Sequence, residues 1–103
     1  MKLHWQRSLR TPNSERFLAS CGGREAAVID LHYLADGTVA GTVVLLEGGG
    51  LGPEQIPEFL QKLDDELLPG VDLGSGNLQF SVVIGTFLGN FQAEGAGGDD
   101  AET

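Results

Sequence analysis

The sequence predicts an α+β fold, in which an antiparallel sheet of about five strands carries one amphipathic helix on one face. Three observations predict it: strand-like segments fill the first half of the chain, one stretch near residue 60 has helical periodicity, and another strand-like segment follows. The expected order is β-β-β-β-α-β. With 103 residues, 41% of them hydrophobic, the chain fits one core. We therefore expect a single domain over residues 1–94 and a disordered acidic tail over 95–103.

The first two strands are predicted on either side of the sequence RTPNS, where proline and asparagine favour a turn. The flanking segments are LHWQRSL and ERFLASC. In the second segment Phe17, Ala19 and Cys21 alternate, so they would share one face of the sheet. A further tight connection is expected at GGRE, before the strongly strand-like run AAVIDLHYL.

The clearest hairpin joins AAVIDLHYL to TVAGTVVLL, and its register follows from the turn that best separates apolar from polar side chains. A two-residue turn, Asp36-Gly37, mixes them. A three-residue loop over residues 35–37, with Gly37 in the left-handed conformation, makes one face almost wholly apolar. The resulting cross-strand pairs are Tyr33 with Val39, Leu31 with Gly41, and Ile29 with Val43.

The helix is predicted from apolar residues that recur at three- and four-residue steps, over about three turns beginning near Ile56 or Pro57. Its apolar positions are Ile56, Phe59, Leu60, Leu63 and Leu67. The last strand is expected in LQFSVVIGTFLGNF, with a bulge or bend at Gly85. Its inward-facing set would be Leu78, Phe80, Val82 and Ile84, followed after the bend by Phe87 and Phe91.

The glycine-rich stretch before the helix, LLEGGGLGPEQIPEF, resembles a phosphate-binding loop because it joins a strand to a helix N-terminus. Pro53, however, occupies the last glycine position of a G-x-G-x-x-G pattern, and no lysine follows as a Walker loop requires. Glu47 and Glu54 would also place negative charge beside the phosphate. We interpret the stretch as a connector between strand and helix.

Charge limits the partners. Five basic residues against Glu15 give residues 1–24 a net charge of +4, and Lys62 against 14 acids gives the remainder −13, for a total of −9. An acidic surface repels phosphate backbones and anionic lipid, so we expect no nucleic-acid partner and no membrane partner. A basic protein partner remains compatible with this charge, as does self-association between the basic start and the acidic remainder.

Other residue types exclude several chemistries. Cys21 is the only cysteine, so no intramolecular disulfide can form and a cytoplasmic location is expected. The charged start lacks the apolar stretch of a signal peptide, and the longest aliphatic run, residues 43–46, is too short to span a membrane. The two histidines stand singly and the acids match no calcium loop, so no metal and no cofactor are expected.

One polar set merits a catalytic hypothesis. Asp30 and His32 lie two residues apart on one strand, so they project from the same face, with Thr42 predicted opposite Asp30. A carboxylate, an imidazole and a hydroxyl are the components of nucleophilic catalysis. Two residues along a strand are about 6.5 to 7 Å apart, however, which is too long for a direct hydrogen bond unless the side chains lean together. We prefer to interpret them as an exposed polar face and expect no enzyme.

The second sheet face is the remaining anomaly, because one helix leaves it uncovered. It carries four aliphatic residues among the polar ones: Val28, Leu34, Val44 and Leu46. Either the N-terminal strand with Trp5 or a second copy of the chain would cover them. The sequence thus predicts a non-enzymatic interaction protein, a homodimer above all. The alternatives are an inhibitor or immunity-type protein that neutralises a basic partner, and a small ligand-binding domain or enzyme with a pocket near the glycine-rich loop.

Overall fold

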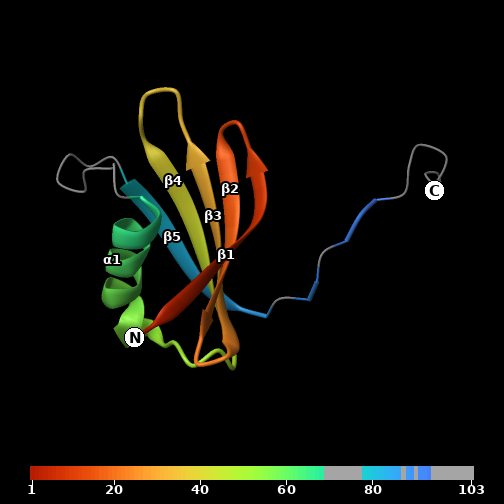
Figure 1. The fold of residues 1–103 in the computed structure, drawn as a ribbon, viewed down its shortest axis with the longest axis vertical. Helices are drawn as coiled ribbons and strands as arrows, with labels where there is room; N and C mark the ends of the chain where they lie inside the picture. The colour runs from red at the N-terminus through yellow and green to blue at the C-terminus, as the bar shows by residue number, and fades with distance from the viewer. Residues whose placement is uncertain (69–77, 87, 90, 94–103) are drawn as a thin grey trace.

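The computed structural model describes residues 1–68, 78–86, 88–89 and 91–93, which form a five-stranded sheet with one helix on one side (Figure 1). The elements are β1 Leu3–Thr11, β2 Ser14–Cys21, β3 Arg24–Tyr33, β4 Val39–Leu46, the short 3₁₀ helix η1 Pro53–Gln55, α1 Ile56–Leu67 and β5 Leu78–Gly85. The predicted element order and α+β class are confirmed.

The sheet has the strand order β1-β2-β3-β4-β5. Its first three pairs are antiparallel, but β4 and β5 run parallel, with Val39 beside Leu78 and Leu46 beside Gly85. The prediction of a purely antiparallel sheet is therefore wrong. The reason is the connection: a 12-residue helix lies along the sheet and returns the chain to the end where β4 begins, so the next strand repeats the direction of β4.

The predicted register of the β3–β4 hairpin is confirmed, including the pairs of Tyr33 with Val39 and of Ile29 with Val43. Gly37 adopts the left-handed conformation, with φ of 90°. The carboxylate of Asp36 accepts a hydrogen bond from the backbone N–H of Thr38, at 2.9 Å, which closes the loop. The polar–apolar alternation and the turn residues thus agree on one register.

Helix α1 begins at Ile56, one of the two predicted residues, directly after η1. Proline at the second position is tolerated there, because its missing N–H has no partner in the first helical turn. Phe59 and Leu63 are buried against the sheet, while the ring of Trp5 on β1 packs on Phe59 with centroids 5.7 Å apart. The indole N–H of Trp5 donates to Glu66 at 2.6 Å, so β1 is fastened to the helix.

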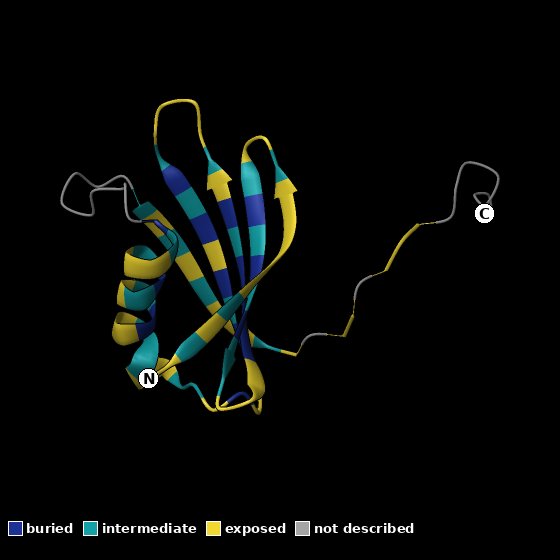
Figure 2. Ribbon diagram, in the orientation of Figure 1, coloured by how far each residue is buried: buried dark blue, intermediate teal, exposed yellow. Residues whose placement is uncertain are grey.

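The side of the sheet that α1 covers is called the helix face, and the core lies there (Figure 2). The buried core residues are Phe17, Ala19, Ala27, Ile29, Leu31, Val39, Val43, Leu45, Phe59, Leu63 and Leu68. Each fully buried large aliphatic or aromatic side chain contributes about 1.5–3 kcal/mol before entropy is counted. The helix is therefore a principal source of stability.

Strand β5 pairs with β4 in regular register to Gly85, without the bulge predicted there. Leu78, Phe80 and Val82 pack against the core as expected, but Ile84 is 55% exposed. Phe91 is 83% exposed rather than directed inward, so the predicted change of phase is wrong for this residue. Phe87 and the tail predicted over residues 95–103 lie outside the described residues.

Candidate functional site

The opposite side of the sheet, called the open face, carries three of the predicted aliphatic residues, Val28 on β3 and Val44 and Leu46 on β4, and Leu34 directly follows β3. Val28 and Val44 are cross-strand neighbours. Val28 and Leu46 are buried, Val44 is half-buried and Leu34 is 48% exposed. Val83 on β5 lies beside Val44 and is 49% exposed, so it extends the same apolar strip. These positions share a face because side chains alternate along each strand.

Trp5 does not cover this strip. Its ring packs against Phe59 of α1, which places it on the helix face. The suggestion that the N-terminal strand folds across the open face is therefore wrong. The physical reason is that β1 pairs with β2 as an edge strand, in register from Leu3 to Arg7, and alternation there directs Leu3 and Trp5 to the side of Ala19.

A hollow of about 260 Å³ lies on the open face. It is lined by Arg16, Val28, Asp30, Val44, Leu46, Thr86 and Gly89. Three aliphatic side chains from adjacent strands therefore border an ion pair, and the segment after β5 supplies the remaining lining residues. Leu46 is the one lining residue that belongs to the glycine-rich stretch, and none of the glycines of that stretch lines the hollow.

The polar set predicted on β3 and β4 divides in the structure. Asp30 does lie opposite Thr42, as predicted, but its carboxylate binds Arg16 through two hydrogen bonds, of 2.6 Å from Nε and 3.3 Å from Nη2. These bonds raise the pKa of Arg16 above its ordinary value. His32 is exposed and neither it nor Thr42 lines the hollow. The three residues are therefore not brought together at one point.

The glycine-rich stretch connects β4 to η1, as interpreted from the sequence. Gly49 is buried against the backbone of Ala26, where an added Cβ would lie 2.7 Å from the Ala26 Cα. Gly48 and Gly50 have positive φ angles, of 81° and 89°. The carbonyl of Gly48 accepts a hydrogen bond from Arg24 at 3.2 Å. The glycines thus permit close packing of the connector against β3.

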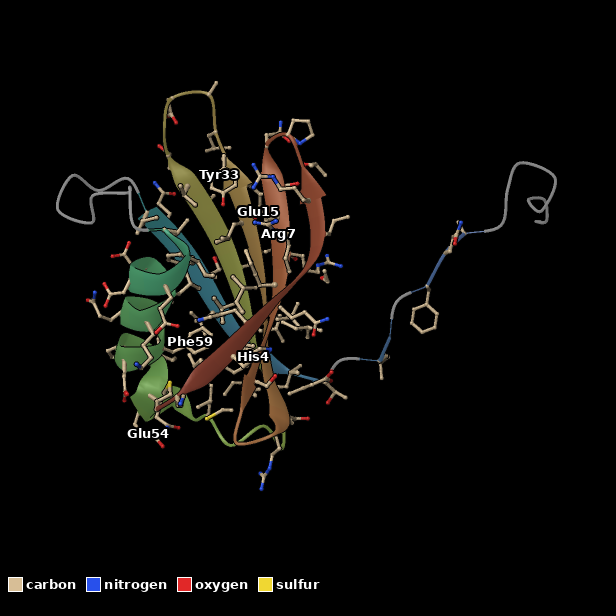
Figure 3. The ribbon with its side chains drawn as sticks, viewed as in Figure 1. His4, Arg7, Glu15, Tyr33, Glu54 and Phe59 are labelled. Atoms are coloured by element: carbon tan, nitrogen blue, oxygen red, sulfur yellow. The ribbon has the colours of Figure 1, made fainter. Side chains whose placement is uncertain are left out.

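A second site, absent from the sequence analysis, lies on the helix face near the β1–β2 turn (Figure 3). Glu15 on β2 is 7% exposed and is the one buried charged residue in the part of the chain that the structure describes. Its Oε1 accepts hydrogen bonds from Arg7 Nε at 2.9 Å and pairs with Arg10 Nη1 at 3.0 Å, and its Oε2 accepts from the Tyr33 hydroxyl. We call these four residues the glutamate cluster.

Two effects oppose one another at Glu15. Burial raises the pKa of its carboxyl, whereas the hydrogen bonds from Tyr33 and Arg10 and the charges of both arginines lower it, and the net shift is downward from 4.5. Burial also raises the pKa of Tyr33, to about 12, and the hydrogen bond to Glu15 adds to the rise. Near neutral pH the cluster therefore contains a carboxylate, a neutral phenol and two guanidinium cations.

The glutamate cluster depends on a bulge that the sequence did not reveal. Arg7 pairs with Phe17 but Leu9 pairs with Arg16, so one extra residue is inserted in β1. Without this bulge, Arg7 and Arg10, which are three residues apart, would point to opposite faces of the sheet. The only available signal was the strong alternation in ERFLASC, which places Glu15 on the same face as Phe17.

The described residues contain no group of three or more histidine, cysteine, aspartate or glutamate side chains placed to hold a metal ion. Within the same residues, no helix has the length and apolar composition to cross a membrane. Compared with protein-family models, with curated proteins and with solved structures, the chain matches none of them. Function is therefore inferred from the chain's own surfaces.

Proposed function

We propose that this chain is a non-enzymatic interaction protein that self-associates as a dimer through the open face. The observation that carries the proposal is the aliphatic strip of Val28, Val44, Leu46 and Val83, which has no helix packed on it in the described part of the chain. Val83 and Leu34 expose about half of their surfaces, at 49% and 48%. Val28 and Leu46 are buried, at 9% and 7%, so the exposed apolar surface of the strip comes from Val83 and the half-buried Val44. Exposed apolar surface marks interaction sites.

Charge favours a second copy as the occupant. At a net charge of −9, most surfaces of two copies repel each other. Along the aliphatic strip, however, the charged lining residues are Arg16 and Asp30, which neutralise each other. Acidic residues instead occupy the solvent side of α1, where Glu58, Asp65 and Glu66 are exposed. The open face is thus the side on which two copies approach with little repulsion.

Symmetry also favours a dimer. Two identical faces meet about a two-fold axis, so each patch must complement itself. A face that carries one cation and one anion beside an apolar strip satisfies this condition, because Arg16 of one copy can approach Asp30 of the other. A face of five strands of about eight residues measures roughly 24 by 26 Å. Its area is close in scale to the ~800 Å² that each partner buries in a standard interface.

The proposal includes a cytoplasmic location, supported by the single cysteine of the sequence. The alternative of an acidic inhibitor is supported by the exposed acids of α1. The dependence of binding on salt concentration distinguishes the two functions. Salt screens the repulsion between two acidic copies and so strengthens the dimer. It also screens the attraction between an acidic helix and a basic partner, and so weakens that complex.

Sedimentation equilibrium over a wide range of protein concentration tests the dimer. Val83 and Ile84 provide a matched pair, because they are adjacent on β5, are 49% and 55% exposed, and point to opposite faces. We expect the unmodified chain to form dimers and Val83→Asp to form monomers, while Ile84→Asp, which adds the same charge, still dimerises. A concentration-independent monomer, or equal loss of dimer in both variants, would contradict the proposal.

A further inference from the structure

The glutamate cluster carries an inference that is independent of the dimer, because it lies on the helix face. Arg7 and Arg10 both contact the same oxygen of Glu15, at 2.9 and 3.0 Å, so their guanidinium groups lie close together. Two cations against one anion leave the cluster with a net positive charge. In a chain of net charge −9, this is a local reversal of sign.

The two arginines are oriented rather than free. Glu15 is buried and its carboxylate is held from the other side by the Tyr33 hydroxyl. The guanidinium of Arg7 also lies over the ring of Phe17, at 5.7 Å from the centroid, which is within the range of a cation–π contact. Arg10 donates from Nε to the carbonyl of Thr11 at 3.0 Å. Each arginine is therefore fixed by two contacts.

Donors remain available on the outer side of both groups. The Arg7 and Arg10 side chains are 55% and 53% exposed. In the described part of the chain, Arg7 uses Nε, and Arg10 uses Nε and Nη1, for hydrogen bonds and ion pairing, so both Nη atoms of Arg7 and Nη2 of Arg10 have no partner there. Guanidinium groups bind carboxylates and phosphates through such paired N–H donors.

We propose that Arg7 and Arg10 form a binding site for an oxyanion, a phosphate or a carboxylate group, and that Glu15 and Tyr33 position the two arginines. Prior orientation reduces the entropy lost on binding. Arg7 and Arg10 are the binding residues, because their free donors meet the ligand. Glu15 and Tyr33 are positioning residues, because they act through the guanidinium groups.

The experiment uses the full chain and two probes, inorganic phosphate and glutarate, at constant ionic strength maintained with chloride. The side-chain Nε–H signals of the four arginines, Arg7, Arg10, Arg16 and Arg24, are followed by nuclear magnetic resonance. We expect saturable shifts confined to Arg7 and Arg10. A stronger response to phosphate than to glutarate assigns a phosphoryl ligand, and the reverse assigns a carboxylate.

Variants identify the residues that bind. We expect Arg7→Gln and Arg10→Gln each to weaken binding about tenfold or more, since a hydrogen bond to a charged group is lost. Arg24→Gln is the matched control, because Arg24 is an exposed arginine whose Nη1 contacts the Gly48 carbonyl away from the cluster. Its affinity should be unchanged. Arg7→Lys keeps the charge but loses the planar donor pair, so its affinity should fall as well.

Several outcomes would overturn the site. Shifts that never saturate, or that affect Arg16 and Arg24 as strongly as Arg7 and Arg10, would indicate general ionic attraction. Equal weakening by Arg24→Gln and Arg7→Gln would have the same meaning. If the glutamine variants fail to fold, the titration of the unmodified chain still decides, because it reports each arginine separately.

Discussion

The two faces of the sheet come from the same five strands, yet they differ in what covers them. On the helix face Ile29 and Leu31 are fully buried, in one core with Phe59 and Leu63 of α1. On the open face Val28 and Leu46 are buried, but Val83 and Leu34 expose about half of their surface. Figure 2 shows the resulting alternation along β4. Alternation decides which side chains share a face, whereas the element packed on that face decides whether they become core.

The faces also differ in how they hold charge. Glu15 is buried on the helix face, and its two oxygens are fully engaged by Arg7, Arg10 and Tyr33. On the open face, the pair of Arg16 and Asp30 keeps 39% and 32% of its side-chain surface in solvent. A buried carboxylate is costly without partners, whereas a partly hydrated pair contributes little, at about 0–1 kcal/mol. The glutamate cluster is therefore the more constrained of the two charged groups.

The largest expected difference in stability comes from truncating one apolar side chain on each face of the sheet. Phe59→Ala removes a ring that is 1% exposed, and we expect a loss of about 3–5 kcal/mol in the free energy of unfolding. Val83→Ala removes a side chain that is 49% exposed, and we expect a change within about 0.5 kcal/mol for the monomer.

Urea denaturation followed by circular dichroism measures both values. Protein concentration must be low enough to exclude the proposed dimer, and a repeat at higher concentration shows whether Val83→Ala acts through association. Comparable losses for the two variants at low concentration would mean that the open face is covered within the monomer. The contrast between the faces would then be lost.

A smaller effect is expected from two glycines on neighbouring strands. Gly41 on β4 lies under the ring of Phe80, and an added Cβ would overlap that ring and approach Leu31 at 3.2 Å. Gly85 on β5 faces the open side, where, among the described residues, an added Cβ would meet Val44 Cγ1 alone, at 3.6 Å. We expect Gly41→Ala to cost about 1–3 kcal/mol, because a filled core resists extra volume.

Gly85→Ala is the control, and its expected effect on the free energy of unfolding is near zero or stabilising by about 0.5 kcal/mol, because glycine in a strand loses more entropy on folding than alanine does. Thermal unfolding of the two variants provides the comparison. Equal tolerance of alanine at both positions would show that the Phe80 ring moves aside easily. The helix face would then be less tightly packed than its burial suggests.

Much of the fold was predictable because local patterns and tertiary packing agree. The loop at residues 35–37 fixed the β3–β4 register, since one turn length alone separated apolar from polar side chains. The helix was predictable from its apolar spacing and from the prolines near its start. In both cases the deciding residues are neighbours in sequence, so no knowledge of distant contacts was needed.

The wrong or missing predictions concern features that are determined by elements distant in the sequence. The direction of β5 depends on how α1 crosses the sheet, and the strand's own residues do not encode it. The bulge in β1 likewise inserts a residue at Ser8 without a glycine to mark it, so the approach of Arg10 to Glu15 could not be inferred. The aliphatic open face was predicted by position, whereas its hollow required the packed strands.

The titration of Tyr33 reports on the glutamate cluster directly, because its hydroxyl donates to Glu15. Tyr33 is the only tyrosine, so the ultraviolet absorbance of its phenolate reports one group. Burial and the hydrogen bond to Glu15 raise its pKa from 10.0 to about 12. Because the folded value is the higher one, the stability that this bond supplies is present below pH 10.0 and is lost as the pH rises toward 12. Glu15→Gln removes the nearby negative charge but keeps the burial.

We therefore expect the Tyr33 pKa in Glu15→Gln to fall below 12 yet remain above 10.0. Glu25→Gln, which removes an exposed carboxylate on β3, should leave it unchanged. At acidic pH the sign is opposite, because the pKa of Glu15 lies below 4.5 in the folded chain. The stability that the Glu15 carboxylate supplies is therefore present above pH 4.5 and is lost as the pH falls through the lower folded pKa. The unmodified chain should thus lose more stability below pH 4.5 than Glu15→Gln does. An unchanged Tyr33 pKa in that variant would mean that burial alone sets it, and that the carboxylate does not organise the cluster.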